Sequence, residues 1–205
     1  KSYLLFSKIQ SLLASGHSWD KVLYVNFEDE RMMGFDVADF NKLLEVQAEL
    51  SGKDSLPALF LDEVQLIEGW EKFARRMADA QAEIYIAGSN AKMLSIQIAA
   101  ALGGRFLTVN VFPLNFSEYL KAKGVAVRKD VWSSTTGKAR ILREFAEFFE
   151  YGGLPECVQF SNKLEYINSV FQKIYLGDII VRNKVTNALP LRILLKKVAE
   201  SIGQP

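Results

Sequence analysis

The chain has 205 residues, 49% of them hydrophobic and 24% charged, which is typical of a globular protein with a sizeable core. Its formal net charge of +1 gives no overall field that attracts nucleic acid, membranes or acidic substrates. The single histidine, His17, excludes histidine-based metal clusters and Ser/His/Asp triads, and the single cysteine, Cys157, excludes an internal disulfide and fits a reducing compartment.

The first predicted element is a helix at the start of the chain. Residues 3–13 place apolar side chains at helical spacing, and Gly16 suits the end of that helix. The chain begins inside this segment without a Met, and it stops at residues 203–205 without a closing element. We therefore expect the sequence to be a fragment of a longer protein.

Three short apolar runs, at residues 22–27, 59–61 and 83–88, predict buried strands of a parallel sheet. Helices are predicted between and after them, and a fourth strand is predicted at 106–112. This alternation of strands and helices predicts parallel βαβ units and a three-layer α/β domain. The predicted helices of this part cover residues 40–46, 69–80 and 93–101.

After Pro113 the pattern becomes helical. A polar stretch at 128–136 indicates a loop, and the segments 164–180 and 189–202 each have the apolar spacing of a long helix. Two further helices are predicted at 116–124 and 141–149. We place a boundary near residue 113, between a sheet domain (1–113) and an all-helical region (114–205).

Two adjacent carboxylates, Asp62 and Glu63, follow the second predicted strand. Open α/β sheets bind ligands at the carboxyl edge. In a P-loop NTPase the Asp at this place holds the Mg²⁺ that bridges nucleotide phosphates, and the following Glu can polarise the attacking water. The alternative is a buried strand that runs into an acidic helix cap.

Two further groups fit phosphate chemistry. Lys1 and Ser2 open a helix, as the last two residues of G-x-x-x-x-G-K-[ST] do, where Lys reaches the β/γ-phosphates and Ser ligates Mg²⁺. Ser89 and Asn90 are polar residues at the end of the third strand, where a sensor of the third phosphate is needed.

Several short motifs follow one another in an order that resembles the prokaryotic AAA-type ATPases with a C-terminal domain of unknown function. The resemblance covers nearly the whole chain, and the ordered set is far more specific than any single motif. The motifs are Lys-Ser-Tyr-Leu-Leu-Phe at 1–6, Leu-Phe-Leu-Asp-Glu-Val-Gln at 59–65, Gly-Trp-Glu at 69–71, Ala-Gly-Ser-Asn at 87–90, Leu-Gly-Gly-Arg at 102–105, Val-Phe-Pro-Leu at 111–114, Phe-Ser-Glu-Tyr-Leu at 116–120, Tyr-Gly-Gly-Leu-Pro-Glu at 151–156 and Gly-Asp-Ile at 177–179.

The resemblance implies an ATP-binding P-loop core with Mg²⁺ and assigns roles by matching positions. Lys1 and Ser2 match the end of the Walker A loop, and the metal ligands are Ser2 and Asp62. Glu63 matches the water-orienting Walker B residue. The implied catalytic residues are Glu63, Ser89, Asn90 and Arg105. The glycines that precede Lys in the Walker A loop, and the strand before them, are absent from this sequence.

Arg105 matches an arginine that related ATPases place as a finger on a neighbouring subunit's nucleotide. This role implies a homo-oligomer in which Arg105 acts in trans. An arginine at the end of a helix also complements the helix dipole, so this alternative stays open.

The expected function is Mg²⁺-dependent ATP hydrolysis. One alternative is a nucleotide-gated regulatory module with little or no turnover, and another is a nucleic-acid-associated motor, because Arg192, Lys196 and Lys197 give a small basic helix face. The partner through the C-terminal region is an unknown protein or DNA. No apolar run reaches the ~18 residues of a membrane span, so we expect no membrane partner and a cytoplasmic location.

Overall fold

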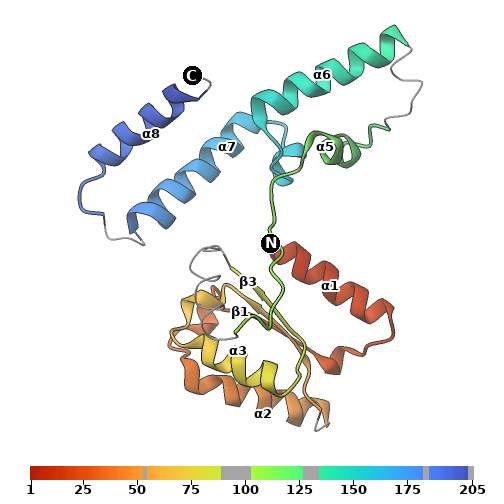
Figure 1. Ribbon diagram of the computed structural model, residues 1–205, viewed down its shortest axis with the longest axis vertical. Coiled ribbons are helices and arrows are strands. Elements are labelled where there is room, and N and C mark those ends of the chain that lie inside the picture. The colour runs from red at the N-terminus through yellow and green to blue at the C-terminus, as the bar shows by residue number, and fades with distance from the viewer. Residues whose placement is uncertain (53–54, 89–102, 127–133, 182–184, 203–205) are drawn as a thin grey trace. The chain divides into compact units, whose positions relative to one another are not determined.

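The computed structural model describes residues 1–52, 55–88, 103–126, 134–181 and 185–202. The predicted helix at 93–101 and most of the predicted loop at 128–136 lie outside the described residues. The chain divides into two compact units, Lys1–Val111 and Phe112–Pro205. We call them the sheet unit and the helical unit (Figure 1).

The sheet unit is built on three parallel strands in the order β1-β2-β3. The strands are β1 (Val22–Asn26), β2 (Ala58–Asp62) and β3 (Ile84–Ala87). In the register of the sheet, Asn26 lies opposite Asp62 and Asp62 lies opposite Ala87, so all three strands end at one edge. The three predicted strands and their parallel arrangement are confirmed.

Helices cover both faces of this sheet (Figure 1). Helix α1 (Ser2–Ala14) packs on the face that carries Phe60, while α2 (Phe40–Ser51) and α3 (Trp70–Asp79) pack on the face that carries Leu59 and Leu61. Successive side chains of a strand point to opposite faces, and β2 is buried on both, which explains its unbroken apolar run. The three-layer α/β fold is confirmed.

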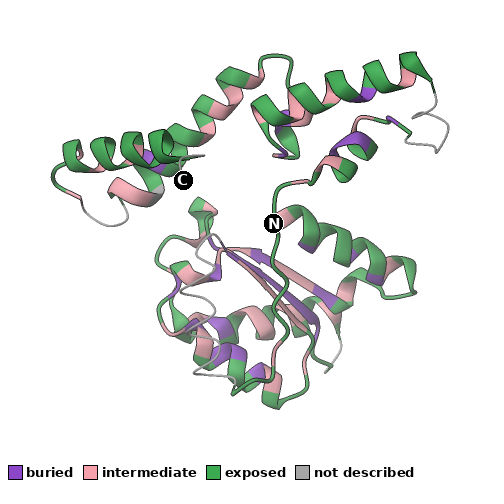
Figure 2. Cartoon of the chain, turned by 45° about the horizontal axis from the view of Figure 1, so that its top comes forward, coloured by how far each residue is buried: buried purple, intermediate pink, exposed green. Residues whose placement is uncertain are grey.

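Buried residues of the sheet unit concentrate on the strands and on the helix faces that meet them (Figure 2). Short 3₁₀ helices join the elements at Trp19–Lys21, Glu30–Met32, Val37–Asp39 and Val64–Leu66. Asp36 caps the third of these with a capping box formed with Asp39, which directs the chain into α2.

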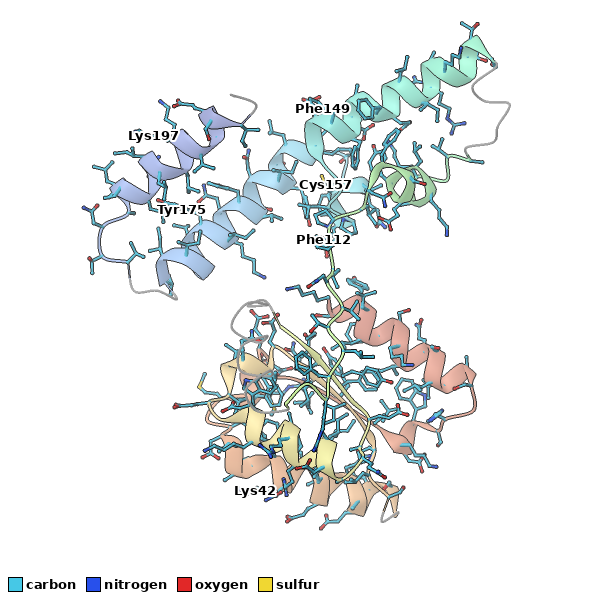
Figure 3. The ribbon with its side chains drawn as sticks, in the orientation of Figure 1. Lys42, Phe112, Phe149, Cys157, Tyr175 and Lys197 are labelled. Atoms are coloured by element: carbon cyan, nitrogen blue, oxygen red, sulfur yellow. The ribbon has the colours of Figure 1, made fainter. Side chains whose placement is uncertain are left out.

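The predicted strand at 106–112 is wrong, because these residues form no regular secondary structure. Leu107 and Val109 are 96% and 78% exposed, and Phe112 also projects into solvent (Figure 3). A strand forms only by pairing with a neighbour, and residues 106–112 pair with none of the three strands β1, β2 and β3.

The helical unit contains four helices among its described residues. Its buried cluster is formed by Tyr119, Leu120, Val125 and Ile141. The long helix predicted from residue 164 begins as an α-helix and continues as π-helical turns. The bounds are α5 (Phe116–Ala122), α6 (Thr135–Tyr151), α7 (Lys163–Gln172) with its π-helical continuation Lys173–Val181, a 3₁₀ turn at Glu156–Val158, and α8 (Leu189–Ser201).

A half-buried ionic cluster joins α5 to α6. The Lys123 ammonium lies 2.8 Å from Glu144 and 2.9 Å from Glu147, and it also donates to the Tyr119 hydroxyl at 3.2 Å. Lys163 reaches Glu147 from the other side at 3.3 Å. The hydrogen bond from Lys123 holds the pKa of Glu147 below its ordinary value.

Replacing Lys123 with Met should destabilise the helical unit by about 2 kcal/mol at neutral pH, because two carboxylates lose a shared charged donor. A carboxyl whose folded pKa is depressed stabilises the fold above its unfolded pKa and loses this effect as the pH falls through the folded pKa. The difference from wild type should therefore shrink in acid. Urea unfolding followed by circular dichroism at neutral pH and at about pH 3 measures it. Lys121→Met, at an exposed position of α5, is the matched control.

Candidate functional site

Asp62 ends β2 and is the one charged side chain that is fully buried among the described residues. Its Oδ2 accepts a hydrogen bond from the Tyr24 hydroxyl at 3.2 Å, and its Oδ1 accepts one from the backbone N–H of Glu63 at 3.1 Å. A buried carboxylate needs such partners, because burial without them is strongly unfavourable. Both oxygens of Asp62 are therefore held in place.

Tyr24 stays a hydrogen-bond donor over a wide pH range. Burial raises the pKa of its hydroxyl to about 12, and the charge of Asp62 and the hydrogen bond to it act in the same direction. The proton therefore remains on the Tyr24 oxygen at neutral pH.

Glu63 lies at the point where the chain leaves the sheet. Its φ of 52° is in the left-handed region, which costs a residue with a side chain roughly 1 kcal/mol. This conformation turns the chain from β2 into the 3₁₀ helix at Val64–Leu66. Within that turn, the Gln65 side-chain amide donates to the Glu63 carboxylate. The structure thus orients the second carboxylate by both its backbone and a neighbouring side chain.

The start of α1 lies at the same edge of the sheet. The Lys1 ammonium donates to the carbonyl oxygen of Gly88 at 2.8 Å. Gly88 directly follows Ala87, which is the register partner of Asp62. Residues 87 places apart in sequence therefore meet, and Lys1 is brought to the strand ends beside Asp62.

Ser2 shares the sheet-facing side of α1. It lies one helical turn before Leu5, at the i, i+3 spacing that puts two residues on one helix face, and Leu5 is buried against the sheet. Asp62 lies two residues after Phe60, so it points to the same face of the sheet, the one that α1 covers. The Ser2 hydroxyl and the Asp62 carboxylate therefore lie at the carboxyl edge of the sheet, on the face that α1 covers.

The remaining predicted site residues are placed differently. Ser89 and Asn90 lie outside the described residues. Arg105 is largely exposed and its guanidinium donates to the Asp79 carboxylate at 2.7 Å, at the last residue of α3. This contact joins Arg105 to the end of α3 within the same chain.

Three partners in the site were missed in the sequence: Tyr24, Gln65 and the Gly88 carbonyl. Gln65 belongs to the same motif as Glu63 and follows it by two residues. Its side chain could have been predicted to contact Glu63, because a tight turn brings such neighbours together. Tyr24 and Gly88 gave no comparable signal, because their roles depend on strand register and on the packing of α1.

The donor set indicates which metal the site fits. Within the described ranges, no three His, Cys, Asp or Glu side chains come together in a way that could cage an ion. A hydroxyl and a single carboxylate beside a lysine suit Mg²⁺, since Mg²⁺ prefers oxygen ligands, keeps several waters and takes phosphate oxygens for the rest. The residues present therefore fit Mg²⁺ bound together with phosphates.

No helix in the parts of the chain that the structure describes combines the length and the apolar character needed to cross a bilayer.

Comparison with known proteins places these features in a family. The sequence model of a protein family described as "AAA domain" matches residues 1–120. An uncharacterized protein of Methanocaldococcus jannaschii is 35% identical over 95% of this chain, and one of Haemophilus influenzae is 31% identical over 100% of it. The chain spans 42% and 49% of the lengths of these relatives. No solved structure matches the chain. The chain belongs to the AAA domain family, and its sheet unit is an ATPase-like nucleotide-binding domain.

Proposed function

We propose that the protein binds ATP with Mg²⁺ at the carboxyl edge of the sheet and hydrolyses its terminal phosphate. The observation that carries the proposal is the contact of Lys1 with the end of β3, beside the buried carboxylate of Asp62. A cation at the start of a helix and an acidic strand end are the two halves of a phosphate–Mg²⁺ site, and the fold brings them together.

Each residue has a role in binding. The start of α1 has no side-chain cap, and the backbone N–H groups and positive dipole end of a helix start both favour phosphate. The Lys1 ammonium has three donors, so it can bind a phosphate oxygen in addition to the Gly88 carbonyl. Ser2 and Asp62 are the residues that hold Mg²⁺. The bound ion neutralises phosphate charge and orients the terminal phosphate.

In the hydrolytic step, Glu63 orients the water and accepts its proton. The water oxygen forms a bond to the γ-phosphorus while the bond to the β–γ bridging oxygen breaks, and the products are ADP and inorganic phosphate. Gln65 fixes the carboxylate that receives the proton. Ser89 and Asn90 are assigned to sensing the γ-phosphate, and Arg105 to stabilising charge on the nucleotide of a neighbouring copy.

The proposal extends to the organisation of the chain. Residues 1–113 act as the nucleotide-binding core, and residues 114–205 act as a helical lid and the start of a C-terminal domain. We assign the protein to the cytoplasm, with a protein or DNA as the partner of that C-terminal region.

Nucleotide binding tests the site directly. Lys1→Ala in the full-length protein should weaken binding of ATP by tenfold or more, since a hydrogen bond to a charged group contributes about 1.5–3 kcal/mol. Titration with a fluorescent ATP analogue measures the dissociation constant. Lys8→Ala is the matched control, because Lys8 lies on the same helix with its ammonium over the ring of Tyr85. Equal weakening by both substitutions contradicts the assignment of Lys1.

A further inference from the structure

Resting on the proposed function, we propose that Tyr24 is a positioning residue for the Mg²⁺ site, and that its hydroxyl holds the Asp62 carboxylate in the orientation that binds the metal. Tyr24 comes from β1, 38 residues before its partner, and its hydroxyl donates to Oδ2 of Asp62 at 3.2 Å. Its hydroxyl acts on the metal through Asp62.

The sheet fixes this pair. Asn26 is the register partner of Asp62, and Tyr24 lies two residues before Asn26 on the same face. A diagonal neighbour on an adjacent strand is within reach of an aromatic side chain. The Tyr24 ring also contacts the ring of Phe6 on α1, with centroids 5.1 Å apart. Strand register and helix packing together position the hydroxyl, so Tyr24 loses little conformational entropy when Asp62 binds a metal.

The hydrogen bond leaves room for a metal. A carboxylate has about four acceptor sites, and Tyr24 and the Glu63 N–H occupy one on each oxygen of Asp62. The remaining sites serve the ion or a water bound to it. Hydrogen bonds of this kind fix the orientation of a metal ligand, and their loss commonly lowers metal affinity 10–100-fold.

The arrangement also explains how Asp62 tolerates its burial. With 1% of its surface exposed, this carboxylate has almost no water to solvate it. A neutral donor compensates the carboxylate for the lost water. A lysine or arginine at the same place would also do so, but its positive charge would compete with the metal for the carboxylate. The Tyr24 hydroxyl is such a neutral donor, and it lies 3.2 Å from Oδ2 of Asp62.

The experiment is a metal-binding titration of the full-length protein with Mn²⁺ as a paramagnetic probe for the Mg²⁺ site, in the presence of ADP. Tyr24→Phe keeps the ring against Phe6 and removes only the hydroxyl. We expect Mn²⁺ to bind about tenfold more weakly to this variant, with ADP affinity in the absence of metal unchanged. In the Asp62→Asn background, Tyr24→Phe should have no further effect on Mn²⁺, because the two residues act as one unit.

Tyr85→Phe is the matched control. Tyr85 lies on β3, stacks on Phe60 and donates its hydroxyl to Glu83 at 3.1 Å. Its replacement should leave Mn²⁺ binding unchanged. Equal Mn²⁺ affinity in wild type and Tyr24→Phe overturns the role of Tyr24 and leaves the proposed function standing. Failure of the wild-type protein to bind Mn²⁺ with ADP overturns both.

Discussion

Replacing Glu63 with Gln is expected to lower steady-state ATP hydrolysis by about 10²-fold or more while ATP still binds. The amide keeps the size of the side chain but cannot accept the proton of the attacking water. Because Lys1, Ser2 and Asp62 are unchanged, the affinity for ATP and Mg²⁺ should persist. Phosphate release by the full-length protein measures the rate, and equilibrium titration with nucleotide measures binding.

Glu68→Gln makes the same chemical change five residues later, at an exposed position, and should leave hydrolysis at the wild-type level. If Glu63→Gln kept the wild-type rate, or if neither the wild type nor Glu63→Gln hydrolysed ATP, Asp62 and Glu63 would serve binding or structure. A nucleotide-gated module with little or no turnover would then be the better description of the protein.

Replacing Phe60 with Ala should destabilise the sheet unit by about 4 kcal/mol, within the range for truncation of a buried aromatic residue. Phe60 is completely buried at the centre of β2, and its ring stacks on that of Tyr85 with centroids 4.6 Å apart. It fills the layer between α1 and the sheet, which sets the distance of Ser2 and Lys1 from the strand ends. Urea unfolding followed by tryptophan fluorescence reports the change, since Trp70 is buried in this unit.

Phe149→Ala removes the same number of atoms from a side chain that is 83% exposed (Figure 3). Its effect should stay within about 0.5 kcal/mol. If both substitutions destabilised the protein equally, the packing of α1 on Phe60 would not be the main support of the sheet unit.

The core of the fold was predictable from sequence because a strand that is buried on both faces has a simple sequence pattern. Residues 59–61 form an unbroken apolar run, and no other common element of that length needs to be apolar on every side. The helix predicted at 69–80 was confirmed as α3 for a related reason, since its buried Trp70, Phe73 and Met77 recur at helical spacing.

The same logic failed at 106–112, where Leu107, Val109 and Phe112 remain exposed. An apolar composition favours strand formation. It does not determine whether the folded chain places another strand alongside for pairing. In the site, the carboxylates were predictable from their place after a strand. Tyr24 was not, because its contact with Asp62 exists only once the register of β1 against β2 is known.

The left-handed backbone of Glu63 has a consequence for how this position responds to selection. Glycine adopts that conformation without strain, so a screen for thermal stability alone would favour glycine there and would discard the carboxylate. Under the proposed function, a glycine at this turn would remove the carboxylate that orients the attacking water. Under the proposed function, glutamate places a carboxylate at this turn at a cost to folding stability.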